Sequence, residues 1–160
     1  MTAAIFRGRR LRAAATVGAV AFGLVALSAC DKPTPLATVT VGSKTVTTEA
    51  ACYNDGESIE TPKVASCLKE GEDKTVKAAM EDKIRFGVDP KIADKGWTIF
   101  INDQAVEPEP NNKTFRSIPA SAFFSTGQGP AVAKTKVSIV EAASGKALGV
   151  WNFTLERDAG

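Results

Sequence analysis

The sequence has no histidine, and this absence narrows the functions that the protein can have. Without histidine there is no imidazole for acid–base catalysis, for metal binding or for a pH switch near neutrality. The G-x-S-x-G, P-loop and G-x-G-x-x-G motifs are also missing, so we expect no cofactor, no metal site and no catalytic residue of those classes. The 160 residues suffice for one ordinary domain, and 44% hydrophobic with 24% charged residues is typical of a globular protein.

The first 26 residues have the pattern of a secretory signal peptide. Four arginines and no acid lie within residues 1–12, and residues 13–26 form an uncharged apolar run. As a helix this run would extend roughly 21 Å, which is short of the roughly 30 Å hydrocarbon core of a bilayer. We therefore expect cleavage rather than a permanent membrane span.

Residues 27–30, Leu-Ser-Ala-Cys, resemble the lipobox of bacterial lipoproteins. The resemblance implies lipidation of Cys30, cleavage between Ala29 and Cys30, and a mature chain of 131 residues on the outer face of the cytoplasmic membrane. The diacylglyceryl anchor would make the membrane its first partner, because two acyl chains hold a protein stably. The alternatives are an ordinary signal peptide that happens to precede a cysteine, or a short buried helix. The pair Arg9-Arg10 leaves twin-arginine export open as the route.

Loss of the signal peptide would change the charge of the protein. It leaves 16 lysines and arginines against 18 acids, a net charge of −2. The remaining cations are mostly lysines and are spread along the chain, as on a solvated surface. Nucleic-acid binding needs a basic face, so we expect no nucleic-acid partner.

The cysteine count predicts one disulfide bond. If Cys30 carries lipid, Cys52 and Cys67 are the remaining thiols, and an oxidising compartment favours their pairing. Closing a loop of about 15 residues contributes roughly 3 kcal/mol in the chain-entropy model. A redox or metal role is the alternative, but the pair lacks C-x-x-C spacing.

The sequence predicts three parts: a signal peptide (1–29), a lipidated tether (30–37) and one β-domain (38–158). Alternating apolar residues and turn signals predict short strands throughout that domain, and a helical turn near residues 118–124. The expected strands are two within 38–48, one within 74–83, and those at 84–88, 97–102, 136–142 and 148–156. The last two form the clearest hairpin, whose expected core residues are Val137, Ile139, Trp151, Phe153 and Leu155. For 74–83 a helix is the alternative, because the apolar residues there also fit helical spacing.

This spacing predicts an all-β fold, an antiparallel β-sandwich that is immunoglobulin-like in the broad sense. A small β-barrel is the alternative. Trp97 follows both cysteines instead of lying between them, so we expect the disulfide to fix a loop at one end of the domain and not to join the sheets. The order of lipobox, close cysteine pair, residues 84–90 (IRFGVDP) and a strand beginning at Trp97 resembles a family of small uncharacterised lipoproteins of high-GC Gram-positive bacteria. That family has no assigned activity, so the resemblance implies no functional residues.

Two spacings are compatible with enzymatic chemistry. Ser66 and Lys69 satisfy S-x-x-K, which on a helix places an amine near a serine nucleophile. Glu107 and Glu109 flank a proline, and paired carboxylates can act as acid and base in glycoside hydrolysis. The chain is short for an S-x-x-K enzyme, and prolines around the glutamates favour an exposed extended connection. We therefore expect no enzyme activity.

Three aromatic residues are the candidates for a partner surface, because alternation does not force them inward: Phe100, Phe115 and Phe124. The resulting functional hypothesis is a lipid-anchored, extracytoplasmic binding or protein-interaction module of the bacterial cell envelope, with an envelope protein or a small ligand as partner. One alternative is an accessory that captures a small ligand for a transport system. A small envelope hydrolase using carboxylates or Ser66 is the other.

Overall fold

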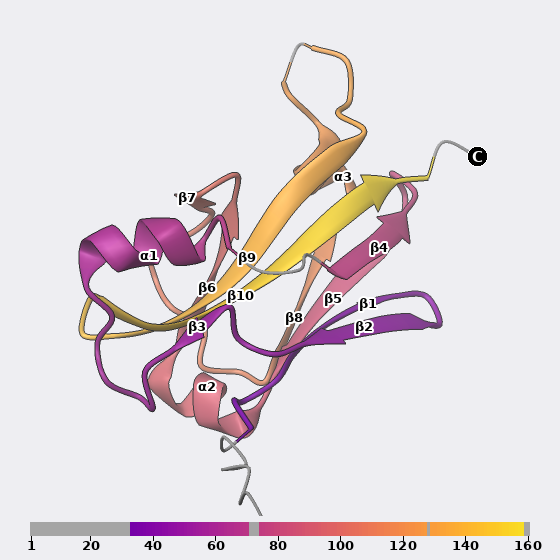
Figure 1. The fold of residues 1–160 in the computed structure, drawn as a ribbon. Helices are drawn as coiled ribbons and strands as arrows, with labels where there is room; N and C mark the ends of the chain where they lie inside the picture. The colour runs from indigo at the N-terminus through magenta and orange to yellow at the C-terminus, as the bar shows by residue number, and fades with distance from the viewer. Residues whose placement is uncertain (1–32, 71–73, 128, 159–160) are drawn as a thin grey trace, which may run out of the picture. The chain divides into compact units, whose positions relative to one another are not determined.

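Two β-sheets pack face to face in the computed structural model, which describes residues 33–70, 74–127 and 129–158 (Figure 1). The first sheet has the strand order β2-β1-β5-β8, and the second has the order β3-β10-β9-β6-β7 with β4 also paired to β10. The strands of the first sheet are β1 (Ala37–Val41), β2 (Lys44–Thr48), β5 (Lys83–Val88) and β8 (Phe115–Pro119). Those of the second are β3 (Cys52–Tyr53), β4 (Lys74–Ala78), β6 (Trp97–Ile101), β7 (Gln104–Ala105), β9 (Lys134–Ala143) and β10 (Lys146–Arg157). The helices are α1 (Thr61–Cys67), α2 (Pro90–Lys95) and α3 (Ser121–Phe124).

The expected all-β sandwich is therefore confirmed, and the strands form two separate sheets instead of one closed barrel. The core-facing residues predicted for the hairpin are also confirmed, because all five side chains are buried between the sheets. They pack against residues of the first sheet such as Val39 and Phe86. Alternation predicted this well because each strand has one face on a shared core.

The second sheet differs from a purely antiparallel one at β4, which pairs with β10 in parallel. The outer edge of β10 is shared by two short strands: β3 pairs with Gly149 and Val150, and β4 pairs with residues 153–157. The two strands thus follow one another along the same edge.

Two short helices were not expected. α2 has six residues and begins at Pro90, whose ring fixes φ near the helical value and whose missing N–H is not needed in the first turn. Its Ile92 and Ala93 are buried in the sandwich core. α1 has seven residues, with Pro62 in its first turn, and it covers the outer face of the second sheet. No helix of the described ranges is long and apolar enough to cross a membrane.

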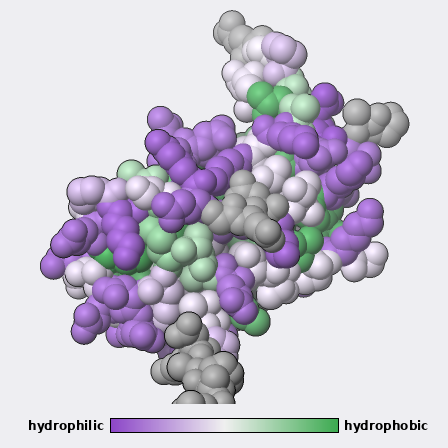
Figure 2. Space-filling view, in the orientation of Figure 1, coloured by the Kyte–Doolittle hydropathy of each residue, from purple (hydrophilic) through white to green (hydrophobic). Residues whose placement is uncertain are grey.

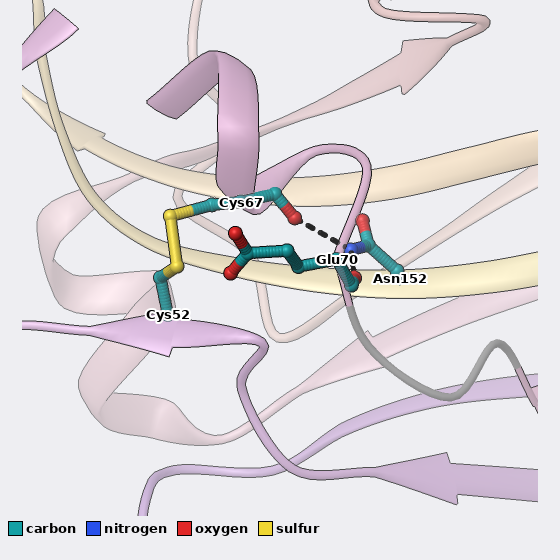
Figure 3. The surroundings of a disulfide bond; sticks show 4 residues. All are labelled: Cys52, Cys67, Glu70 and Asn152. Carbon is teal, nitrogen blue, oxygen red and sulfur yellow. Dashed lines mark hydrogen bonds between the residues drawn. A yellow bond between two sulfur atoms is a disulfide. The ribbon is translucent and has the colours of Figure 1, made fainter. Parts of the chain in front are cut away.

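The disulfide and a buried asparagine attach α1 to the second sheet (Figure 3). Cys52 on β3 is bonded to Cys67 at the end of α1, with their Cα atoms 5.7 Å apart. Asn152 Nδ2 on β10 donates to the carbonyl oxygens of Cys67 at 2.8 Å and Glu70 at 2.6 Å, while Asn152 Oδ1 accepts from Ser138 Oγ at 2.6 Å. The disulfide joins a helix to the edge of one sheet and, as expected, does not join the two sheets.

The predicted signal peptide, with Ala29 and Cys30, lies outside the described residues.

Candidate functional site

A pocket of about 370 Å³ opens at the end of the sandwich that carries α2 and the chain leading into β1. Its walls come from that leading chain, from the corner after β3, from α2 and from β9. The charged residues that line it are Asp55, Lys91, Asp94, Lys95 and Glu141. We call it the Glu141 pocket, because Glu141 is the one of these five that is buried.

Glu141 lies on β9 at a position where the sequence pattern would place an apolar residue. It follows Val137 and Ile139 at two-residue spacing, so its side chain lies on the core-facing side of the sheet. Its neighbours across the strands are Trp97 on β6 and Gly149 on β10. The side chain is 2% exposed, and its Oε2 atom has no hydrogen-bond partner within the described part of the chain.

The space around Glu141 depends on a glycine at the neighbouring position of β10. A Cβ atom at Gly149 would lie 2.5 Å from Trp151 Cη2 and 3.0 Å from Tyr53 Cδ2, so no larger residue fits there without displacing a ring. The Tyr53 and Trp151 rings pack with centroids 6.1 Å apart, and a β-bulge between Ala147 and Gly149 bends β10 at this point. The glycine thus leaves room for Tyr53, which lines the pocket, to pack against the buried Trp151 ring.

The chain that leads into β1 is held against Trp151 by a buried hydrogen bond. Trp151 Nε1 donates to the carbonyl oxygen of Pro35 at 2.8 Å. Pro33 and Pro35 both line the pocket, and Pro35 is buried. The pocket is therefore built partly from the segment that we expected to serve as the tether.

Burial controls the ionisation of the pocket. Desolvation raises the pKa of Glu141 from 4.5 to about 7, and the positive charge of Lys95 only partly opposes that shift. No cation in the described ranges lies within 4.0 Å of its carboxylate. Burial, followed by the negative charges of Glu141 and Asp55, raises the pKa of the Tyr53 phenol. At neutral pH the pocket therefore holds a carboxyl that is close to half ionised and a neutral phenol.

The residues that suggested enzyme chemistry are not brought together in this pocket. Ser66 and Lys69 are both exposed, and a backbone hydrogen bond runs from Lys69 N to Ser66 O. Glu107 forms a two-pronged ion pair with Arg116, which lowers the pKa of that carboxyl, and Glu109 is exposed. An ionised Glu107 held by arginine is poorly suited to donate a proton.

The three candidate aromatic residues have three different environments. Phe115 on β8 is 57% exposed, with the Arg85 guanidinium 5.8 Å from its ring centroid. Phe100 on β6 is half-buried and packs against the apolar cluster beneath α1. The prediction for Phe124 is wrong, because its side chain is 0% exposed. Residues 121–124 form a helical turn, so Phe123 and Phe124 both reach the core, which two neighbours on one strand do not do.

The face shown in Figure 2 is mostly hydrophilic or intermediate, with hydrophobic residues scattered in small groups. The three aromatics come from β8, β6 and α3 and do not form one continuous apolar surface.

Glu141 and Tyr53 were missed by the sequence analysis, although a signal was present. In the strand predicted at 136–142, Glu141 has the same parity as Val137 and Ile139, so alternation alone placed an acid toward the core. An acid at a core-facing position is costly unless it is paired, and such positions are candidates for function.

Comparison of this chain with family models, with curated proteins and with solved structures finds no significant match.

Proposed function

We propose that the protein is a lipid-anchored binding module of the bacterial cell envelope, and that its ligand occupies the Glu141 pocket. The observation that carries the binding role is a buried glutamate among the residues that line an open pocket, whose Oε2 atom has no hydrogen-bond partner among the described residues. An unsatisfied buried acid costs folding free energy, and a ligand that supplies its partner removes that cost. A small ligand suits this geometry better than a protein partner, because the exposed aromatic residues are dispersed.

The proposed anchor lies close to the pocket along the chain. Cys30 precedes Pro33 by three residues, a distance of at most about 11 Å in a fully extended chain. Lipidation at Cys30 would hold the pocket near the membrane surface. A role in passing a small ligand to a transport system is compatible with that placement.

The anchor is tested by fractionating cells that express the full chain or its Cys30→Ala variant. We expect the wild type in the membrane fraction, with an intact mass that includes a diacylglyceryl group on an N-terminal Cys30. The variant should leave the membrane fraction. Retention of Cys30→Ala in membranes at the wild-type level would contradict lipid anchoring.

The ligand site is tested by native mass spectrometry of the protein extracted from membranes with mild detergent. Asp94→Trp places a bulky side chain at the rim of the pocket, and Glu81→Trp is the matched control in the exposed turn that precedes β5. We expect a small-molecule adduct on the wild type and on the control, and its loss from Asp94→Trp. An adduct that is equal in all three proteins, or no adduct in any, would overturn the assignment of the site.

A small envelope hydrolase is the second candidate, and the raised pKa of Glu141 is the observation that favours it. A carboxyl that keeps its proton near neutral pH is suited to donate that proton to a leaving group, with Asp55 or Asp94 as the second carboxylate. Mass spectrometry separates the two functions, because a hydrolase would release fragments of the bound molecule and a binding module would return it intact. Glu141→Gln would abolish such fragmentation.

A further inference from the structure

The charges around the Glu141 pocket indicate which chemical group it accepts. Two lysines, Lys91 and Lys95, and two aspartates, Asp55 and Asp94, are exposed and line the pocket, so their charges balance. Glu141 is the fifth charged residue, and its ionisation gives the pocket a net negative charge. A cation is therefore the ligand that compensates for the ionised pocket.

The neighbours of Glu141 define the cation further. Trp97 and Gly149, its cross-strand neighbours, supply no charge, and α2 supplies Lys95, which remains outside ion-pair distance. Tyr53, which also lines the pocket, carries an aromatic ring and a hydroxyl group. An ammonium group donates to a carboxylate and to a hydroxyl oxygen, and it is attracted to an aromatic face. Pro33 and Pro35 offer apolar contact to the carbon atoms of such a ligand.

From this arrangement we infer that the Glu141 pocket binds the ammonium group of its ligand, with the Glu141 carboxylate as counter-ion. The inference deepens the proposed function and rests on it for the use of this pocket. Ammonium groups near the outer face of a membrane have two sources, the headgroup of an aminophospholipid and a free amine in solution. The experiment separates these sources.

Binding should be coupled to ionisation. The ammonium ligand pairs with ionised Glu141, whose pKa is about 7 when the pocket is empty. Below that pH the carboxyl must release its proton before it can form the ion pair. Affinity should therefore be about ten-fold higher at pH 8 than at pH 6. The other titratable and charged groups that line the pocket are Tyr53 from β3, Asp55 from the following corner, and Lys91, Asp94 and Lys95 from α2. The variant Glu141→Gln separates the contribution of Glu141 to the pH dependence of affinity from the contributions of these other groups.

The test is an NMR titration of backbone amides in the full mature protein, solubilised from membranes. Ethanolamine is the soluble probe, and ethylene glycol, with a hydroxyl in place of the ammonium group, is the matched control. The proteins are the wild type, Glu141→Gln, and Glu81→Gln as an exposed control. We expect ethanolamine to shift the amides of Tyr53, Lys95 and Glu141, with the ten-fold pH effect, in the wild type and in Glu81→Gln. Absence of these shifts at pH 8, or equal affinity in Glu141→Gln or for ethylene glycol, would overturn the inference.

A second arm places the same protein in vesicles of phosphatidylglycerol with or without phosphatidylethanolamine. Shifts that need phosphatidylethanolamine identify a lipid headgroup as the source, whereas shifts with ethanolamine alone identify a soluble amine. Both results support an ammonium ligand. If the fractionation experiment contradicts lipid anchoring, the ethanolamine titration still tests the ammonium site. The anchor proposal and the ammonium proposal can therefore fail independently.

Discussion

Glu141 is a buried acid at a strand position where alternation predicts an apolar side chain. Burial of an acid without a paired charge costs folding free energy. Burial raises its pKa to about 7, and the nearby charge of Lys95 does not restore the ordinary value. Its Oε2 atom has no hydrogen-bond partner among the residues that the structure describes. A group whose folded-state pKa exceeds its unfolded value makes stability depend on pH. This dependence gives a test of its environment that needs no ligand.

We predict that Glu141→Gln flattens the pH dependence of the free energy of unfolding. Between pH 4.5 and 7 the folded wild type holds the Glu141 proton more tightly than the unfolded chain does, so stability falls as pH rises through that interval. From pH 5 to pH 8 the wild type should lose about 2 kcal/mol more than Glu141→Gln. Urea unfolding at the two pH values measures the difference. Glu81→Gln should retain the wild-type dependence, and an equal loss in Glu141→Gln would show that Glu141 titrates normally.

At the scale of single residues, the sequence placed core positions better than it placed the site. Val137, Ile139 and Trp151 were predicted to be buried because alternation is a local signal. The same signal pointed Glu141 inward, but the pocket needs Tyr53 and Lys95 from other elements, and only the fold brings these together. The Cys52–Cys67 pair was predicted from compartment and count, which require no three-dimensional information.

The element whose stability depends most on distant contacts is α1. Seven residues provide too few turns for a helix to be stable alone, and too few for a periodic pattern to be visible. The disulfide to β3 and the hydrogen bond from Asn152, 85 residues further along the chain, attach the end of this helix to the sheet. α2 was missed for the related reason that its six residues begin at a proline, which the sequence analysis interpreted only as the end of a strand.

We predict that the double variant Cys52→Ser/Cys67→Ser loses about 3 kcal/mol of folding stability, because the loop that the bond closes spans 15 residues. Amide hydrogen exchange should accelerate first in α1, while β1 and β5 remain protected. Reduction of the wild type should reproduce the change. Unaltered exchange in α1 would show that Asn152 and the apolar cluster hold the helix without the disulfide.

For the whole molecule, local patterns predicted the sandwich but not all of its pairings. The hairpin of β9 and β10 is set by a short turn, whereas the parallel pairing of β4 depends on the part of the β10 edge that β3 leaves free. The core likewise contains side chains from elements that were not predicted, as Ile92 of α2 shows.

Substitution of two phenylalanines tests how the domain divides into core and surface. Phe124→Ala removes a fully buried ring and should lower the free energy of unfolding by about 3 to 5 kcal/mol. Phe115→Ala removes an exposed ring and should change it by about 0.5 kcal/mol or less. Thermal and denaturant unfolding measure both. Equal effects of the two substitutions would contradict the placement of α3.

The proposed site depends on Glu141, a buried carboxyl at the end of the sandwich that has no hydrogen-bond partner among the described residues. Carbon-13 NMR of the glutamate carboxyl groups, titrated between pH 3 and pH 9, tests it most directly, with Glu141→Gln to assign the signal. We expect a Glu141 midpoint near pH 7 in the ligand-free protein. A midpoint at or below 4.5 would mean that Glu141 is paired or solvated, and it would contradict the proposed site.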